Sequence, residues 1–562
     1  MKKCTLLSLI PLIILGISLL PLISFFHPGL PITHDGRDHV VRIANFYASL
    51  QEGILIPRWA GNLNWGYGHP ILMFLYPFSS YTASVLHFIG FSFVDATKAV
   101  FVISYIASLL TMYVWMKEVW GTKVGFVGAL LYGFAPYRFV DLYVRGAIGE
   151  HAAFVFPPLI CYFLYKLAIR EKSIRYHVSS VKHGIGLTVS FALFILSHNA
   201  ISLMFLPVIG LYVLYLYVYE SKLSLYFMLN TLYFILLGFG LSAFFWIPAF
   251  FEGKYTLRNI VTAGEAMTRF VPFSWFFYSP WNYGGTATLT KSIGYFQWIG
   301  LITSIIIILK SKNMRVRILL AASLMIFIFS LFIMTSASEF IWTRIKILQN
   351  FQFPWRFLSL TTFIAAVIGG IGIVELPSVL ARFLSRYCSS YIIVCSLLII
   401  ASTIYMWHPK GYAADGDTSY AGIYAGTTDT GESSPIWSVR FMEHTPANPM
   451  EVIDGDAKIE AERRLSTIHE YRVRATKQTR LVENTLYFPG WKIYVDGISA
   501  GLQFQDSTYR GLMTFWIDEG DHYVVVKFTD TKRRRVATMI SLASVLLIVL
   551  SGCVFIVCRK RK

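Results

Sequence analysis

Runs of roughly 18 to 22 mostly apolar residues recur along this chain from Leu6 onward, and each is about long enough to cross a bilayer as a helix. Hydrophobic residues occupy 55% of the 562 positions and charged residues only 14%. A single soluble core cannot absorb that much apolar surface. The sequence therefore predicts an α-helical integral membrane protein that crosses the bilayer many times.

Lysine and arginine gather in short clusters between the apolar runs. The formal net charge is +18, but no basic face is interleaved with aromatic residues, which argues against a nucleic-acid partner. Cytoplasmic loops of membrane proteins are rich in Lys and Arg, and this rule explains the clusters. The four densest clusters, which we expect on the cytoplasmic side, are 166–182, 310–317, 382–386 and the C-terminal RKRK.

With these four clusters on the cytoplasmic side, the apolar runs between them predict about twelve transmembrane helices and the orientation of each. The N-terminal segment is expected to be an uncleaved first span, because bulky residues occupy the place of a cleavage site. An extra apolar run at 70–91 would reverse every later loop if it crossed, so we expect an interfacial or re-entrant helix there. The basic residues at 532–535 oppose this orientation, but long loops weigh little in the rule. The predicted spans are 5–26, 98–116, 123–140, 152–170, 182–198, 200–219, 224–244, 292–309, 317–335, 357–376, 389–406 and 536–558.

The composition changes between residues 407 and 533. Gly, Asp, Ser and Thr become more frequent, and short alternating runs such as TLYFPGWKIYVDG and DHYVVVKFTD appear. This pattern predicts a β-sandwich-like domain outside the cytoplasm. The predicted organisation is a transmembrane domain over 1–406, the β-rich domain over 407–533, and a last span with a basic tail over 534–562.

The six cysteines lie in or beside predicted spans, and none forms a CxxC pair or a zinc spacing. The sequence therefore predicts neither a disulfide framework nor a thiolate metal site.

The first outer loop, 27–97, carries the densest group of polar residues. If the chain is helical from Asp35 onward, Asp35, Asp38, His39 and Arg42 share one face at three- and four-residue spacings. A carboxylate at a membrane surface can take a proton from an attacking hydroxyl, and a neighbouring Arg or His can bind a phosphate. The alternative is a set of solvated loop charges in which Asp35 caps the helix.

A second polar cluster follows the predicted span 123–140. Arg145 is a candidate phosphate ligand and Glu150 a supporting carboxylate, beside glycines that permit a tight backbone. The alternative is a helix start with Glu150 and His151 near its dipole. Charged side chains so close to the hydrocarbon cost free energy unless they are paired or serve a function, and this favours a functional role for the cluster. The cluster comprises Tyr137, Arg138, Asp141, Tyr143, Arg145, Glu150 and His151.

Two further residues lie at predicted span ends. His198 in LSHNA either packs through a hydrogen bond or faces substrate, and the sequence leaves both open. Arg356 in FQFPWRF begins a span at the predicted outer surface, with Trp355 and Phe353 beside it. It is either an interfacial anchor or a phosphate clamp for a polyprenyl lipid.

The outer loops also carry a family resemblance. The chain resembles the GT-C superfamily of polytopic membrane glycosyltransferases and, more narrowly, the prokaryotic membrane family labelled 6-pyruvoyl-tetrahydropterin-synthase-related. The label itself does not indicate the activity, because such a synthase needs a histidine-ligated zinc site that this sequence lacks. The resemblance rests on HDGRDHVVR, IPRWAGNLNWGYGHP, APYRFVDLYVRGAIGE, LSHN, FQFPWRF and YFPGWKIYVDG.

The resemblance implies a GT-C-like fold and an inverting glycosyl transfer. An acidic residue of the first outer loop is then the catalytic base or a metal ligand, here Asp35, with Asp38 as second choice. Many family members show paired acidic residues, whereas this chain has HisAsp followed by AspHis, so a divalent cation stays an open question with Asp35 and His39 as its candidate ligands.

We therefore expect transfer of a sugar from a polyprenyl-phosphate donor to an acceptor outside the cytoplasm. A non-catalytic polyprenyl-lipid transporter or envelope assembly protein, using the same arginines, is the alternative. A receptor that binds its ligand through the β-rich domain is a third hypothesis. The expected catalytic residues are Asp35, Asp38 and Glu150, and the expected substrate-binding residues are His34, His39, Arg42, Arg145, His151, His198 and Arg356.

Overall fold

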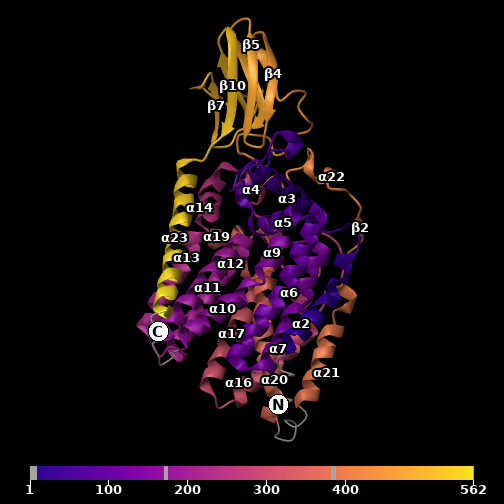
Figure 1. The fold of residues 1–562 in the computed structure, drawn as a ribbon. Coiled ribbons are helices and arrows are strands. Elements are labelled where there is room, and N and C mark those ends of the chain that lie inside the picture. Colours follow the sequence, from indigo (N-terminus) through magenta and orange to yellow (C-terminus); the bar gives the residue numbers. More distant parts are fainter. Residues whose placement is uncertain (1–8, 170–174, 381–387, 561–562) are drawn as a thin grey trace.

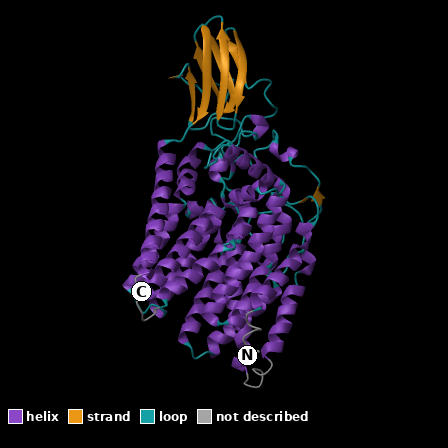
Figure 2. Ribbon diagram, in the orientation of Figure 1, coloured by secondary structure: helices purple, strands orange, loops and turns teal. Residues whose placement is uncertain are grey.

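The computed structural model describes residues 9–169, 175–380 and 388–560. A body of long, roughly aligned helices carries a β-sandwich at one end, and the helix that follows the sandwich returns along the body (Figure 1). Helices make up the body and strands the projecting domain (Figure 2). We call the end of the body beneath the sandwich the sandwich end.

Eight helices of the described chain are long and apolar enough to cross a membrane, and a ninth results if a pair bent by 68° counts as one span. The chain is thus a multi-pass membrane protein, but the expected number of twelve spans is not confirmed. The eight are Phe93–Trp120, Ile148–Ala168, Ser180–Ser197, Asn199–Tyr219, Met314–Phe332, Pro354–Val379, Ser389–Met406 and Lys532–Cys553.

The other four predicted spans are apolar helices that are shorter or bent. Ile10–Phe26 and α16 (Tyr295–Lys310) are shorter than the eight. Helix α7 (Thr122–Gly133) ends well before residue 140, where the predicted span stops. The span predicted at 224–244 corresponds to α13 (Leu225–Leu241), which bends sharply into α14 (Ala243–Glu252).

Helix α20 (Leu358–Leu380) forms the centre of the body, and its spanning window is fully buried. Small residues let its neighbours approach closely, as is common between membrane helices. A Cβ added to Gly300 of α16 would lie 2.4 Å from the Cα of Gly369. The remaining helices around this centre are α6 (Phe93–Trp120), α10 (Phe156–Ala168), α11 (Arg175–Ser197), α12 (Asn199–Tyr219), α17 (Met314–Phe332), α21 (Cys388–Ala401) and α23 (Lys532–Lys560).

The apolar run 70–91 forms two short helices, α4 (Ile71–Phe74) and α5 (Phe78–Phe88), interrupted before Pro77. An 11-residue helix is about 16 Å long, roughly half of the hydrocarbon thickness. The segment is therefore too short to cross as a helix. It lies beside α3 (Gly36–Gln51) at the sandwich end (Figure 1).

The sandwich consists of two antiparallel sheets. In β10 (Gly520–Phe528), Val524 and Val526 are buried while Tyr523 is exposed, which is the alternation the sequence predicts. One sheet has the order β4 (Ala457–Arg464), β5 (Ile468–Ala475), β10, β7 (Trp491–Val495) and β8 (Ile498–Ser499). The other has the order β3 (Met450–Asp454), β6 (Thr479–Leu486) and β9 (Leu512–Ile517).

Residues 408–449 precede the sandwich and run along the sandwich end as an extended segment, which we call the strap. Its strand β2 (Tyr412–Ala413) pairs with β1 (Leu30–Pro31), directly after the first helix. Further along, the backbone of Tyr424 exchanges hydrogen bonds with Asn62 and Trp65 of the first outer loop. The first strand of the sandwich begins at Met450. The strap, which lies between α21 and this strand in the chain, covers the first outer loop.

Candidate functional site

The two polar clusters predicted from the sequence meet at the sandwich end. The backbone N–H of His34 donates to the carbonyl of Val144 over 2.9 Å, and that of Asp35 donates to the carbonyl of Arg145 over 2.8 Å. Gly146 makes this contact possible, because it has a φ of +66° and a Cβ there would lie 2.2 Å from the Thr33 hydroxyl oxygen. The first outer loop is thus fixed by main-chain bonds against the segment that carries Glu150.

Asp35 occupies the N-cap position of α3, but its carboxylate forms no capping hydrogen bond. The capping role that the sequence left open is therefore not observed. The side chain is half-buried and, within the described residues, forms no ion pair. Its charge acts on Arg145 and on the Tyr76 hydroxyl, so the carboxylate lies among the other site residues without being bound by them.

Asp38, His39 and Arg42 share the helix face predicted for them, and each has a partner. Tyr424 of the strap donates to Asp38 over 3.1 Å, and the Arg42 Nε donates to the Thr428 hydroxyl over 2.9 Å. Burial raises the pKa of Asp38, and the positive charge of Arg42 opposes this shift. Asp38 is therefore engaged by the strap, whereas Asp35 has no such partner in the described chain.

His39 is buried, and Arg42 Nη1 lies 3.1 Å from its Nδ1. Because a guanidinium only donates, Nδ1 is the acceptor and the ring proton is on Nε2. Burial and then the charge of Arg42 lower the pKa of His39 well below its usual value. His39 is accordingly a neutral imidazole with its Nδ1 occupied.

A buried ion-pair network holds Arg145 and Glu150. Arg145 Nη1 lies 2.5 Å from Asp141 and 2.6 Å from Glu150. Hydroxyls of Tyr137 and Ser359 both donate to Glu150 Oε1 over 2.6 Å. Paired and hydrogen-bonded in this way, Glu150 supports the site and is not free to exchange a proton with substrate.

The Arg145 segment owes its position to a short π-helix, η3 (Val140–Arg145), between α8 (Pro136–Phe139) and α9 (Ile148–Ala153). A π-helix is a rare local widening that often occurs at functional sites. Here it places Arg145 Cζ 4.6 Å from the ring centre of buried Trp355. The ring and the two carboxylates together enclose the guanidinium.

Arg356 lies three residues before Ser359, whose hydroxyl binds Glu150 of the network. Its Nη1 donates to the carbonyl of Phe351 over 2.8 Å, whereas its buried Nε has no partner in the described chain. The guanidinium also lies 4.8 Å from the ring centre of Phe353. Its positive charge acts on Glu150 and His198, which places it at the site.

His198 caps α12. The backbone N–H of Ile201 donates to its Nδ1 over 3.2 Å, so the packing role that the sequence left open is observed. Its other face is at the site, because the ring stacks on Tyr76 with 4.7 Å between ring centres.

His34 and His151 are not part of this arrangement. His34 is exposed and its Nε2 lies 3.4 Å from the carbonyl of Tyr283. His151 is fully buried between the rings of Phe101 and Tyr105, and neither ring nitrogen has a partner in the described chain. The cluster 137–151 therefore contributes Arg145 and Glu150 to the site but not His151.

Tyr76 and Ser359 belong to the site but were not predicted from the sequence. Tyr76 lies in the break between α4 and α5, and its ring contacts Gly149 so closely that a Cβ there would lie 1.8 Å from Cε2. A hydroxyl-bearing residue before a helix-breaking proline inside an apolar run was a usable signal. Ser359 carried no signal, since serines are frequent in membrane helices.

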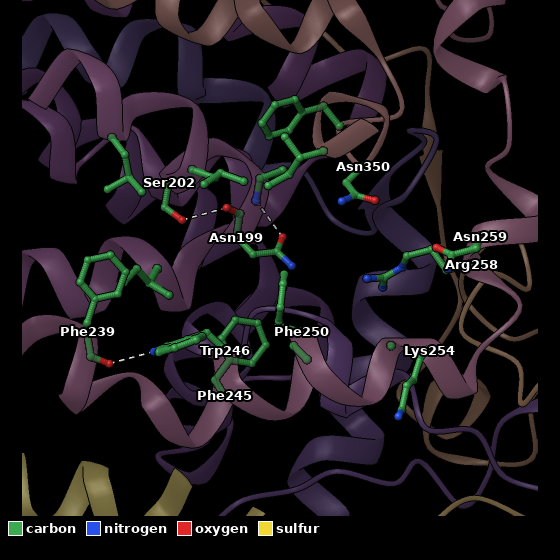
Figure 3. Close-up of a pocket in the computed structure, with 18 residues that line it drawn as sticks. Asn199, Ser202, Phe239, Phe245, Trp246, Phe250, Lys254, Arg258, Asn259 and Asn350 are labelled. Atoms are coloured by element: carbon green, nitrogen blue, oxygen red, sulfur yellow. Dashed lines mark hydrogen bonds between the residues drawn. The ribbon is translucent and has the colours of Figure 1, made fainter. Parts of the chain in front are cut away.

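An apolar groove adjoins the site between α12, α14 and the short helix α19 (Lys346–Gln349). The cavity has a volume of about 400 Å³. Figure 3 shows Phe239, Phe245 and Trp246 toward one side and the basic residues Lys254 and Arg258 toward the other. Two residues that line the groove connect it to the site. The carbonyl of Phe351 accepts a hydrogen bond from Arg356, and Asn199 directly follows His198.

No three His, Cys, Asp or Glu side chains of the described ranges lie close enough together to hold a metal ion. Asp35 and His39 are two of the needed ligands at most, and Nδ1 of His39 is occupied by Arg42. The residues present therefore do not fit a divalent cation in this arrangement.

No family model matches the chain. A protein of Lactococcus lactis subsp. cremoris (strain MG1363) that is described as uncharacterized is 24% identical over 267 residues, which are 44% of this chain and 40% of that protein. The narrower family named from the sequence therefore stays a prediction.

Two solved glycosyltransferases are similar in structure. The arabinofuranosyltransferase AftD from Mycobacteria has a TM-score of 0.45 and 11% identity, covering 72% of this chain and 27% of that one. The oligosaccharyltransferase AglB from Archaeoglobus fulgidus, solved with an inhibitory peptide and a dolichol-phosphate, has a TM-score of 0.44 and 14% identity, covering 77% and 61%. The chain spans less than two thirds of the length of each of these relatives.

The site thus contains some polar groups without a hydrogen-bond partner in the described chain and others whose hydrogen bonds are all formed within the protein. In the described chain the Asp35 carboxylate, the Tyr76 hydroxyl and the buried Arg356 Nε form no hydrogen bond, whereas Glu150 and Arg145 are bound to each other. A free carboxylate beside arginines can accept a proton from a hydroxyl while the arginines bind an anion.

Proposed function

We propose that the chain is a membrane glycosyltransferase that moves a sugar from a polyprenyl-phosphate donor to an acceptor hydroxyl at the sandwich end. The observation that carries the proposal is the position of Asp35. Among the described residues its carboxylate is unpaired, yet main-chain bonds of 2.9 and 2.8 Å fix its segment against the one that carries Arg145 and Glu150. A base held rigidly beside cations is the arrangement that base-assisted displacement from a phosphate needs.

In the proposed step, Asp35 takes the proton of the acceptor hydroxyl. The acceptor oxygen forms a bond to the anomeric carbon of the sugar, and the bond from that carbon to the phosphate oxygen breaks. Polyprenyl phosphate leaves with the electron pair, and Asp35 then returns its proton to solvent through its exposed edge. A single displacement of this kind inverts the configuration at the anomeric carbon.

Arg356 is the proposed phosphate ligand. Its Nε has no partner in the described chain, and a guanidinium bound to phosphate forms strong charge-assisted hydrogen bonds. Arg145 contributes its charge from behind, since its own hydrogen bonds are satisfied by carboxylates.

The groove is the proposed path of the lipid. It is lined mainly by apolar side chains, it adjoins Arg356 through Phe351, and Phe250 on its wall is largely exposed on the surface of the body. A polyprenyl chain can lie in it and continue into the bilayer.

We further propose that the sandwich end faces away from the cytoplasm. Helix α23, which leads to the basic C-terminal residues, ends far from the sandwich (Figure 1). By the rule for basic loops that distant end is cytoplasmic. A donor dissolved in the membrane is then required, because nucleotide sugars are made on the other side.

The test uses purified full-length protein in lipid nanodiscs with a panel of undecaprenyl-phosphate hexoses and pentoses and an extract of membrane glycans as acceptor. Release of undecaprenyl phosphate is measured. We expect Asp35→Asn to lower the rate at least about 100-fold, the usual contribution of a general base. The control is Asp95→Asn in the first turn of α6, whose carboxylate pairs with Lys98 at 3.0 Å.

Asp38→Asn tests the second candidate for the base and is expected to cost less than Asp35→Asn. Wild-type turnover by Asp35→Asn would overturn the base assignment. Wild-type protein that binds undecaprenyl phosphate but releases none from any donor would favour the lipid transporter or assembly protein.

A further inference from the structure

Tyr76 contacts the site through His198 and through Gly149, which precedes Glu150. Helix α4 ends at Phe74, where Leu75 becomes extended with a ψ of 138°, and Pro77 disfavours a helical backbone at Tyr76 before it. The ring is then enclosed from two sides. It stacks on His198 at 4.7 Å, and it lies against the backbone of Gly149, next to Glu150.

The charges around the Tyr76 hydroxyl are mainly positive. Arg42, Arg145 and Arg356 all act on it, and Asp35 is the carboxylate that opposes them. Three arginines from three different segments are therefore near enough for their charges to act on this hydroxyl, although Arg145 is itself paired with Asp141 and Glu150. Such surroundings attract an anion.

The Tyr76 side chain is only partly buried, and its hydroxyl forms no hydrogen bond to any residue in the described ranges. The hydroxyls of Tyr137 and Tyr424, by contrast, donate to carboxylates of the site. Burial, followed by the surrounding charges, raises the pKa of Tyr76 to about 12, so the phenol is a hydrogen-bond donor at neutral pH.

We propose that the Tyr76 hydroxyl donates a hydrogen bond to the phosphate of the lipid carrier. The inference rests on the proposed function and adds a ligand residue that it did not contain. The phenol keeps its proton throughout. As the bond between the anomeric carbon and the phosphate oxygen breaks, negative charge grows on the phosphate, and this hydrogen bond strengthens with it.

The test measures binding of two probes, undecaprenyl phosphate and undecaprenol, to full-length protein in nanodiscs. We expect Tyr76→Phe to weaken the binding of undecaprenyl phosphate by about tenfold, the usual effect of one hydrogen bond to a charged group. The binding of undecaprenol should be unchanged. The ring and its stacking on His198 are kept in this variant. Tyr81→Phe in α5 is the matched control, since its hydroxyl donates to the carbonyl of Leu55 over 2.6 Å.

Equal binding of undecaprenyl phosphate by wild type and Tyr76→Phe would overturn the proposal, and so would an equal loss for both probes, because that result indicates packing. If Tyr76→Phe does not fold, 3-fluorotyrosine at position 76 replaces it. The more acidic phenol is expected to tighten binding of undecaprenyl phosphate, and an unchanged affinity would again overturn the proposal.

These outcomes are distinct from a failure of the proposed function. In that case the wild-type protein binds undecaprenyl phosphate no better than undecaprenol, and the effect of Asp35→Asn on turnover is absent as well.

Discussion

The backbone N–H of Asp35 donates to the carbonyl of Arg145 over 2.8 Å. This bond joins two loops that are 110 residues apart in the chain and unites the two polar clusters in one site. Because it is a main-chain bond, it survives replacement of either side chain. The chemical role of each side chain can therefore be tested without taking the loops apart.

Glu150 and Asp35 are expected to differ in their effect on stability. Glu150→Gln leaves Arg145 with one carboxylate and places an amide against two hydroxyl donors, so we expect a loss of about 3–5 kcal/mol in unfolding free energy. Asp35→Asn breaks no ion pair and is expected to leave the melting temperature in detergent nearly unchanged. Equal melting temperatures for the two variants would contradict the distinction between a supporting and a reacting carboxylate.

Gly149→Ala is expected to displace the Tyr76 ring. The added methyl would lie 1.8 Å from the ring, and overpacking of this kind typically costs about 1–3 kcal/mol. Gly210→Ala in α12 is the matched control, because no atom lies within 4 Å of its added methyl. Melting temperatures of both variants check the prediction, which fails if Gly149→Ala is as stable as Gly210→Ala.

Filling the groove is expected to block the lipid. Leu203 of α12 lines the groove, so Leu203→Trp should weaken binding of undecaprenyl phosphate in nanodiscs by about tenfold or more. Leu211→Trp adds the same bulk to an exposed position of α12 outside the groove. If both variants bind the lipid equally well, it does not lie in this groove.

Acid is expected to destabilise the protein through His69. Burial lowers the pKa of His69 to about 4, whereas the unfolded chain binds the proton near pH 6.5. Neutral His69 therefore makes its full contribution to the unfolding free energy above pH 6.5, and this contribution is lost as the pH falls from 6.5 to 4. At pH 5 the loss amounts to about 2 kcal/mol.

Melting temperatures at pH 7.5 and 5 check this prediction. The drop should be smaller in His69→Asn than in wild type, although the variant loses the contact with Ser434 at 3.2 Å. His444→Asn, at an exposed position, should retain the wild-type drop. An unaltered drop in His69→Asn would show that other groups govern the acid sensitivity.

Arg534 is expected to secure the start of the last helix. Its guanidinium is fully buried and lies 2.6 Å from Glu252 at the end of α14. Arg534→Met removes one partner of a buried pair and should cost about 3–5 kcal/mol. Arg533→Met, at an exposed neighbouring position, should be close to neutral. Thermal unfolding in detergent compares them, and similar melting temperatures would refute the role of the pair.

Arg534 also shows how a local pattern can mislead. In the sequence, residues 532–535 are four basic residues that compete with the C-terminal RKRK for the cytoplasmic side. In the structure, one of the four is neutralised by Glu252, nearly 300 residues earlier. Its charge is therefore part of the packing between α14 and α23 and says little about topology.

The sequence by itself determined the membrane class, most of the long helices and the strand alternation of the sandwich. Apolar length and two-residue alternation are local properties that burial alone imposes, so they can be read from neighbouring residues. The sequence also indicated four charged residues so close to the hydrocarbon that an unpaired, unused charge would be costly. They are Asp35, Arg145, Glu150 and Arg356.

Only the tertiary structure decided which of these groups are free. Glu150 is engaged by Arg145, Tyr137 and Ser359, and Asp38 by Tyr424 of the strap, whereas Asp35 has no side-chain partner in the part of the chain that the structure describes. Ser359 and Tyr424 are 209 and 386 residues away from the carboxylates that they bind, although Arg145 and Tyr137 are close to Glu150 in the chain. Whether a carboxylate is paired depends on what packs against it in space, and that information is absent from the residues around it in the chain.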